Sequence, residues 1–180
     1  QIIGLLRSNL KRFAVTIKDL TTFIETDNFT HDHESEEIDI HEVAGNVKQD
    51  LGNLITDTNA RLEIVSDENL AFSFPKKNFK SMLYNLVSNA IKYRSPDRTP
   101  EVLVKLHKTG GKIVLSVSDN GLGIPAESQN KLFTMFKRFH DHVEGSGLGL
   151  YIVKRMVDSC KGQIKVHSEV NKGTTFTIVF

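Results

Sequence analysis

The sequence contains very little cysteine and no long apolar stretch. Cys160 is the single cysteine among 180 residues, which excludes an intramolecular disulfide and a cysteine-rich zinc site and weakly favours a reducing compartment. No run of about 18 apolar residues occurs, so we do not expect this chain to span a membrane. Lysine and arginine number 23 against 22 aspartates and glutamates, without the basic excess typical of nucleic-acid-binding proteins.

The residues that are present predict a folded domain. Hydrophobic residues make up 39% and charged residues 25% of the chain, as in globular proteins, and the length fits one domain. The chain begins with Gln1 and carries no signal peptide, so we interpret it as a piece of a longer protein.

The N-terminal part predicts a helix followed by a linker. Apolar residues over 1–26 recur at three- and four-residue steps, which fits either a docked terminal helix or a truncated dimerisation helix. Residues 31–42 carry a net charge of −6, against +7 for the remainder, and such a run is usually a solvated linker. His31, His33 and His41 lie within it, but their spacing matches no closed zinc site.

The rest of the chain alternates helices with short strands. Helices are expected over 38–59, 79–93 and 148–160, and 131–143 is expected to be helical and then loop-like. Strands are expected over 61–66, 70–74, 101–107, 112–118, 163–168 and 174–180. Hairpins around Gly110 and Asn171 imply antiparallel pairing. We therefore predict an α+β fold, a two-layer sandwich of helices on a mixed, mostly antiparallel sheet.

The helix over 79–93 carries a polar stripe. Asn85, Asn89 and Lys92 fall within about 60° of one another at 100° per residue. An amide oxygen suits Mg²⁺ and a lysine supplies a mobile positive charge for phosphate. From spacing alone, an ordinary polar outer face is the commoner explanation.

Two glycine-rich segments and an aromatic segment follow. Residues 119–125 can form a ligand-binding turn, in which Asp119 accepts a hydrogen bond from an amine, or a plain turn. Residues 145–150 open a helix, a typical phosphate site, although no strand precedes them as a dinucleotide-binding unit requires. Residues 131–140 combine three phenylalanines with two basic residues, which fits a segment that closes over a ligand or a short core helix.

Taken in this order, the segments resemble the catalytic ATP-binding domain of sensor histidine kinases, which belongs to the GHKL superfamily with the Bergerat fold. The resemblance covers about residues 36–180. The matching segments are 85–93 for the N box, 119–123 for the G1 box, 133–139 for the F box, 145–150 for the G2 box and 173–176 for the final Gly-Thr element.

The resemblance implies that the chain binds ATP and Mg²⁺. Asn89 would coordinate the Mg²⁺, Asn85 would lie on the phosphate side, and Lys92 would contact phosphate. Tyr93 would pack on the adenine, and Asp119 would accept a hydrogen bond from the adenine amine.

Further residues are implied around the pocket and in a lid over about residues 126–146. Gly121 and Gly123 would shape the pocket, while Lys137 and Arg138 would reach the terminal phosphate. The other implied binding residues are Gly145, Gly147, Leu148, Gly149 and, through water, Thr174. Asn85, Lys92 and Arg138 are the predicted catalytic residues.

Asn85 bears on the reaction. Superfamily members that hydrolyse ATP resemble one another in having glutamate at this position, and asparagine cannot act as a general base. The residue therefore favours phosphoryl transfer to a protein side chain over rapid hydrolysis, and the family resemblance implies that this side chain is a histidine. A GHKL ATPase and a nucleotide-binding scaffolding module with a degenerate kinase site remain alternatives.

The resemblance also implies domains and partners. Residues 1–30 resemble the second helix of a dimerisation hairpin with the start of a linker, and residues 31–180 the catalytic domain. The family's acceptor-histidine motif is not found, so we expect no self-phosphorylation. Expected partners are a phosphoacceptor domain of the same parent protein, a response regulator and a second parent copy, with no nucleic acid. The implied location is cytoplasmic, and membrane anchoring of the parent stays open.

Overall fold

The computed structural model describes residues 35–67, 70–137 and 146–180, together with Leu10, Ala14, Ile17 and Thr21. Those four residues are helical, and the remainder of the helix predicted over 1–26 lies outside the described residues, as do His31 and His33. Within the described part of the chain, no helix combines the length and apolarity needed to cross a membrane.

Five strands form the main sheet, in the order β2-β4-β5-β7-β6. Their bounds are Arg61–Ser66 for β2, Glu101–Thr109 for β4, Lys112–Asp119 for β5, Gln163–Glu169 for β6 and Gly173–Val179 for β7. β2 runs parallel to β4, whereas the other neighbouring pairs are antiparallel. The predicted mixed, mostly antiparallel sheet is therefore confirmed.

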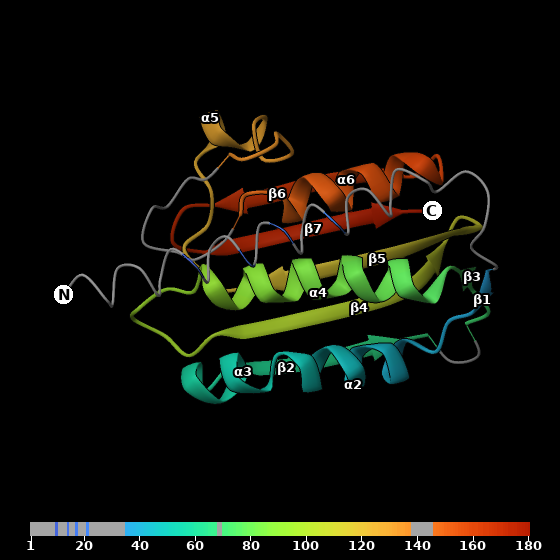
Figure 1. Cartoon of the computed structure of the whole chain (residues 1–180), viewed down its shortest axis with the longest axis horizontal. Helices are drawn as coiled ribbons and strands as arrows, with labels where there is room; N and C mark the ends of the chain where they lie inside the picture. The colour runs from blue at the N-terminus through green and yellow to red at the C-terminus, as the bar shows by residue number, and fades with distance from the viewer. Residues whose placement is uncertain are drawn as a thin grey trace.

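Three helices lie side by side on one face of this sheet (Figure 1). α2 (Ile40–Asp50) packs against β2, α4 (Lys76–Lys92) against β4 and β5, and α6 (Gly149–Ser159) against β6. Two shorter helices are α3 (Gly52–Thr58) and α5 (Ala126–Gln129). The two-layer α+β architecture is thus as predicted.

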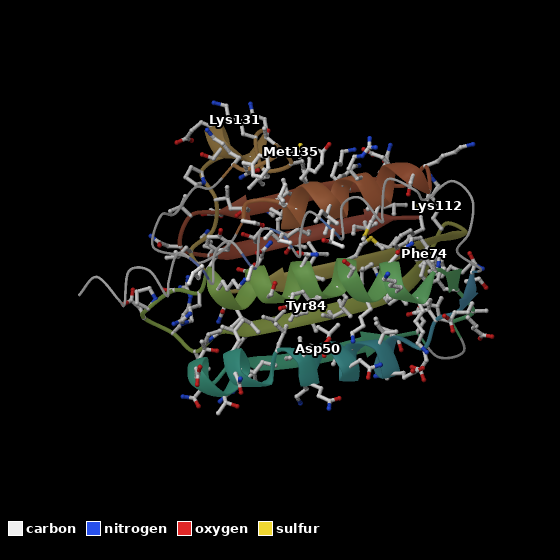
Figure 2. The ribbon with its side chains drawn as sticks, in the orientation of Figure 1. Asp50, Phe74, Tyr84, Lys112, Lys131 and Met135 are labelled. Atoms are coloured by element: carbon white, nitrogen blue, oxygen red, sulfur yellow. The ribbon has the colours of Figure 1, made fainter. Side chains whose placement is uncertain are left out.

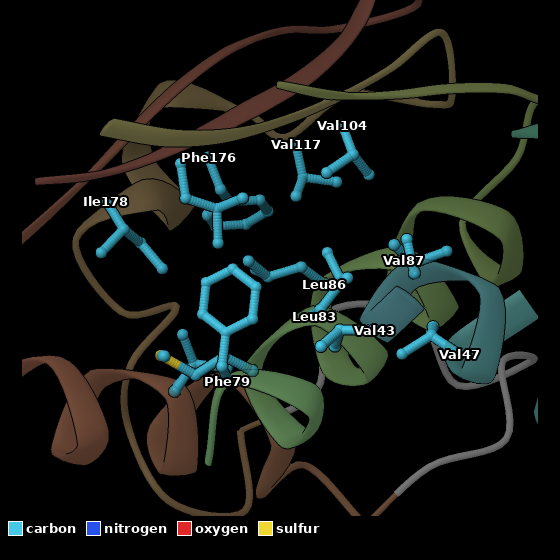
Figure 3. Packing of buried hydrophobic residues seen from close by; sticks show 14 of the residues in the cluster. Val43, Val47, Phe79, Leu83, Leu86, Val87, Val104, Val117, Phe176 and Ile178 are labelled. Atoms are coloured by element: carbon cyan, nitrogen blue, oxygen red, sulfur yellow. The ribbon is translucent and has the colours of Figure 1, made fainter. Parts of the chain in front are cut away.

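The hydrophobic core fills the space between the helices and the sheet. The apolar face of α4 is buried as its spacing predicts, through Phe79, Met82, Leu83, Leu86, Val87, Ala90 and Ile91. Figure 3 shows this face directed toward Val104, Val117 and Phe176 on three neighbouring strands. Because alternate strand residues share a face, one row of side chains per strand meets α4 and fixes its position over the sheet.

The helix predicted over 38–59 is two helices. Leu51 has φ −94° and ψ 8°, which are not α-helical values, and its side chain is buried. Gly52, a poor helix former, starts α3, and Asn59 ends it in a left-handed conformation. The prediction of a single helix is wrong because apolar periodicity does not register a local turn of the backbone.

The acidic run is only partly a linker. Glu36–Glu37 form β1, which pairs antiparallel with β3 (Ser73–Phe74). Asp39 caps α2 by accepting hydrogen bonds from two backbone N–H groups of its first turn. The interpretation of 31–42 as a solvated linker is therefore wrong from Glu36 onward, and the strand predicted over 70–74 is confined to its last two residues.

The chain after α5 runs in turns. Residues 130–137 contain no helix, and Phe136 has φ +57°, which no right-handed helix accommodates. The helical start predicted for 131–143 is thus wrong over its described part. Figure 2 shows Lys131 on this segment, at the opposite end of the molecule from Phe74 and Lys112.

Shortening a core side chain tests the packing of α2. Val47 is 0% exposed and Val170 is 51% exposed. We expect Val47→Ala to lower the free energy of unfolding by about 2 kcal/mol, because it loses buried methyl groups and leaves a cavity. The matched Val170→Ala should stay within about 0.5 kcal/mol of the unchanged protein. Urea unfolding measures both, and equal effects would contradict this packing.

Candidate functional site

The predicted site residues gather at one end of the sheet. Asp119 ends β5 and is paired in register with Thr174 of β7, Tyr93 caps the C-terminus of α4, and Gly149 begins α6. In Figure 1 this end lies opposite β1 and β3. The sheet and the two helices therefore bring residues from four distant segments together.

Asp119 is held by two backbone donors. Its Oδ1 accepts a hydrogen bond from the N–H of Gly121 at 2.8 Å and from the N–H of Thr174 at 3.2 Å. Burial raises the pKa of Asp119 from 3.8 to about 6, against the lowering effect of these donors and of the Arg98 charge. Both donors bind Oδ1, so Oδ2 is the oxygen with room for a ligand's N–H group.

The glycines around Asp119 are required by close backbone approach. A Cβ on Gly121 would lie 2.5 Å from the carbonyl oxygen of Tyr93, and one on Gly173 would lie 1.9 Å from the carbonyl oxygen of Asp119. Gly123 has φ +69°, and a Cβ there would lie 2.0 Å from the carbonyl oxygen of Glu169. At these three positions the neighbouring backbone leaves no space for a side chain.

The N-terminus of α6 meets the polar stripe of α4. The Nδ2 of Asn85 donates to the carbonyl oxygen of Ser81 at 3.0 Å, and a Cβ on Gly149 would lie 2.5 Å from its Oδ1. No described side chain caps α6. The start of α6 also carries the positive end of the helix dipole, which attracts anions.

Leu148 contributes to this site differently from the other predicted residues. Its side chain is fully buried in the core, and its backbone N–H donates to the Oγ of Ser146 at 3.1 Å. Its side chain therefore fastens the start of α6 to the core, and any direct contact with a ligand stays a prediction.

Asn89 and Lys92 follow Asn85 on α4 and are half-buried. The Asn89 side chain forms no hydrogen bond with another side chain or backbone group in the described ranges, so its hard amide oxygen fits a Mg²⁺ ligand. No group of three His, Cys, Asp or Glu residues in the described ranges could hold a metal ion. A magnesium ion at Asn89 would therefore need further ligands from water or from bound phosphates, as Mg²⁺ commonly has.

The aromatic segment approaches the start of α6. Gly147 has φ +77°, and a Cβ on it would lie 2.9 Å from the carbonyl carbon of Phe136 and 3.1 Å from the carbonyl oxygen of Lys137. Lys137 is exposed and so is available to a ligand near this helix. The predicted residues Arg138 and Gly145 lie outside the described residues.

Sequence reasoning missed Arg98. Its guanidinium donates to the carbonyl oxygens of Asn120, Gly121 and Asn171, which belong to the two segments beside Asp119. The residue lies in the loop between α4 and β4, where no periodicity or motif marks it. Only the folded arrangement gives it these partners.

Ser168 and Gln129 were also missed. The Ser168 Oγ accepts from the N–H of Ile124 at 2.8 Å and donates to the carbonyl oxygen of Gly173 at 2.9 Å. Gln129 Nε2 donates to the carbonyl oxygens of Ile124 and Ser168, each at 3.0 Å. These bonds hold the end of the glycine-rich turn after β5, at Ile124, against β6. In the sequence, Ser168 is marked only as a residue of an alternating strand, which does not indicate these contacts.

Solved structures define the class of this fold. The catalytic domain of the histidine kinase ThkA is 26% identical and superimposes with a TM-score of 0.69, over 82% of this chain and 95% of that one. Full-length ShkA, solved in complex with AMPPNP, superimposes with a TM-score of 0.81 at 20% identity, over 99% of this chain and 37% of that one. The fold is that of histidine kinase catalytic domains.

The chain belongs to the family of histidine kinase-, DNA gyrase B- and HSP90-like ATPases, whose model matches residues 76–180. Among its relatives, the sensor protein RprX of Bacteroides fragilis is 39% identical over 102 residues, which are 54% of this chain and 20% of RprX. The circadian input-output histidine kinase CikA of Synechococcus elongatus is 35% identical over 59% of this chain and 14% of CikA. The chain thus spans a fifth or less of these relatives, and the family predicted from the motifs is confirmed.

Two glycine substitutions test the tight turn. We expect Gly123→Ala to lower the free energy of unfolding by at least about 1–2 kcal/mol, because the left-handed backbone strains a side chain and the Cβ meets the carbonyl of Glu169. Gly45→Ala in α2 meets nothing within 4 Å and should stabilise by roughly 0.5–1 kcal/mol. Denaturant unfolding checks both, and a neutral Gly123→Ala would refute the close approach of these two backbone segments.

Proposed function

We propose that this chain binds ATP with Mg²⁺ and transfers the γ-phosphoryl group to a histidine on a dimerisation domain of the same parent protein. The observation that carries this proposal is the pairing, in one site of this family, of a half-buried carboxylate with a helix N-terminus. Asp119 suits the amine of a purine, and the start of α6 suits phosphates.

The adenine is recognised at Asp119. Its Oδ1 is already occupied by the N–H groups of Gly121 and Thr174, so Oδ2 accepts the hydrogen bond from the 6-amino group. Tyr93 packs against the ring, and Thr174 contributes through water. Because Asp119 is partly buried, a bound base that gave Oδ2 no hydrogen bond would cost free energy. The site therefore favours a base that carries a donor.

The phosphates lie between α4 and α6. Asn85 lies against Gly149 at the start of α6, and Lys92 and Lys137 add positive charge. The family resemblance gives Arg138 the role of reaching the terminal phosphate. Asn89 supplies the amide oxygen for Mg²⁺, which neutralises charge on the β- and γ-phosphates when bound.

Phosphoryl transfer follows from this positioning. A nitrogen of the acceptor imidazole attacks the γ-phosphorus, the bond from that phosphorus to the β–γ bridging oxygen breaks, and ADP leaves with the electron pair. The imidazole proton is lost to solvent. Asn85 has no proton affinity with which to activate water, so a nucleophilic side chain is favoured over hydrolysis.

The wider assignment concerns the parent protein. We infer that residues 1–30 form the second helix and linker of the dimerisation hairpin, that residues 31–180 form the cytoplasmic catalytic domain, and that the parent is a homodimer which passes phosphate to a response regulator. The support is the family and relatives whose names describe sensors and histidine kinases.

Phosphotransfer in trans tests the function. The chain is incubated with Mg-ATP labelled at the γ-phosphate, alone and with a dimerisation domain that carries an acceptor histidine. We expect acid-labile label on the supplied domain and none on the chain. Nucleotide binding without any transfer would support the scaffolding module instead, and steady release of phosphate without acceptor would support an ATPase.

Removal of the amide at position 89 tests the metal site. We expect Asn89→Ala to weaken Mg-ATP binding roughly tenfold or more, because outer-shell changes alone cost this much in metal affinity, and to reduce the effect of Mg²⁺ on that binding. Asn53→Ala, an exposed position on α3, is the matched control. Calorimetry with and without Mg²⁺ measures both, and an equal response of the two variants would contradict the role of Asn89.

The titration of Asp119 predicts a pH dependence of nucleotide binding. Its pKa rises from 3.8 to about 6 in the folded protein, so the favourable contribution of this group to stability is present below about pH 4 and is lost as the pH rises through 6. Nucleotide affinity should change in the opposite direction, because only the ionised carboxylate is a full acceptor.

We therefore expect the affinity for ADP to increase between about pH 5 and pH 8 and to be weak and nearly flat in Asp119→Asn. In that variant the amide oxygen keeps the two backbone donors, and the NH₂ group then faces the donor of the base. Calorimetric titrations across this range check the prediction, and tight binding by Asp119→Asn would contradict it.

A further inference from the structure

Arg98 connects two segments that are separate in the sequence. Its Nε donates to the carbonyl oxygen of Asn120 at 2.5 Å, and its Nη2 donates to that of Gly121 at 2.9 Å. The same Nη2 also donates to the carbonyl oxygen of Asn171, in the turn between β6 and β7. One side chain thus joins the turn after β5 to the turn before β7.

These two turns carry the partners of Asp119. The N–H of Gly121 comes from the first turn, and the N–H of Thr174 lies three residues after Asn171. The turns also meet directly, since the N–H of Asn171 donates to the carbonyl oxygen of Leu122 at 2.7 Å. Arg98 therefore holds the frame from which both donors reach Oδ1.

The loop that carries Arg98 is fixed to the same frame. Asn120 Nδ2 donates to the carbonyl oxygen of Thr99, and Asn120 Oδ1 accepts from the N–H of Glu101, each at 3.0 Å. The guanidinium has five donors in a planar fork, whereas a lysine has one compact ammonium on a flexible stem. This fork allows one arginine side chain to contact the three carbonyl oxygens of Asn120, Gly121 and Asn171 at once.

Charge adds to this geometry. Among the described residues, Arg98 is the charged side chain that acts on Asp119, and it lowers the pKa of that carboxyl against the effect of burial. The other elements around Asp119 act through backbone: β7 through the N–H of Thr174, the following turn through the N–H of Gly121, and the end of α4 through the Tyr93 carbonyl beside Gly121.

We propose that Arg98 is a positioning residue for nucleotide recognition: it holds the two backbone donors on Oδ1 of Asp119 and favours the ionised carboxylate, so that Oδ2 stays available to the nucleotide's amine. This inference rests on the proposed function, because it takes Asp119 as the receptor of the base. Arg98 does not touch the nucleotide itself.

Two variants of the full chain separate geometry from charge. Arg98→Lys keeps the positive charge but lacks the planar group whose Nε and Nη2 donate from separate positions, and Arg98→Gln removes both features. Arg61→Gln is the matched control, because Arg61 is an exposed arginine that pairs with Glu101 on the sheet edge. Binding of Mg-ADP is measured by calorimetry from about pH 5 to pH 8. The titration of the Asp119 carboxyl is followed by carbon NMR without nucleotide, and thermal unfolding verifies that each variant is folded.

We expect both Arg98 variants to bind Mg-ADP about tenfold more weakly at about pH 8, where the carboxyl is ionised. The titration of Asp119 should move upward by about half a pH unit or more in Arg98→Gln, by less in Arg98→Lys, which keeps the charge, and not at all in Arg61→Gln. A role confined to overall stability would not separate the lysine from the glutamine variant in this way.

Wild-type affinity for Mg-ADP in Arg98→Gln at this pH would overturn the proposal, as would an unchanged Asp119 titration in that variant. If the unchanged protein itself fails to bind Mg-ADP, the proposed function is refuted. The proposal for Arg98 would then fail as well, because it takes Asp119 as the receptor of the base. If the unchanged protein binds Mg-ADP and only the Arg98 variants behave differently from expectation, the role of Arg98 is refuted and the proposed function is not.

Discussion

A single carboxylate oxygen, Oδ1 of Asp119, connects the end of β5 to the turn that follows it and to the start of β7. Much of the local sequence follows from this contact. The backbones approach so closely that Gly121 and Gly173 have no space for a Cβ. Burial opposes the charge on the carboxylate while the two N–H donors support it, so the pKa of Asp119 depends on how many donors reach the group.

The other half of the site relies on a different physical effect. Asp119 offers a hydrogen-bond acceptor, whereas the start of α6 offers the positive end of a helix dipole. Gly149 lets this helix end come against Asn85 without a side chain between them, and the buried Leu148 holds it to the core. A ligand with a donor-bearing base at one end and anionic groups at the other matches both halves, which is the shape of a purine nucleotide.

Features that depend on residues close together in the sequence, such as the apolar face of one helix or the alternation of one strand, were predicted correctly. The buried face of α4 and the strands around β5 follow from local spacing. All seven apolar residues predicted for that face are buried, although the helix starts three residues before the predicted position and ends one residue before it. Features that depend on remote partners were not predicted. The break at Leu51, the pairing of β1 with β3 and the three carbonyl partners of Arg98 leave no periodic trace, because each arises only when distant segments meet. The left-handed Phe136 lies in an amphipathic pattern that looks helical.

The bond between Asp119 and Thr174 joins residues 55 positions apart, and β7 is among the last segments of this sequence. A chain emerging from the ribosome therefore cannot complete this end of the sheet until β7 has been added beside β5. Any nucleotide that prefers this arrangement binds the complete fold and not its precursors, and by mass action it shifts the folding equilibrium toward the finished domain. A nucleotide bound at this end would then act as a folding ligand.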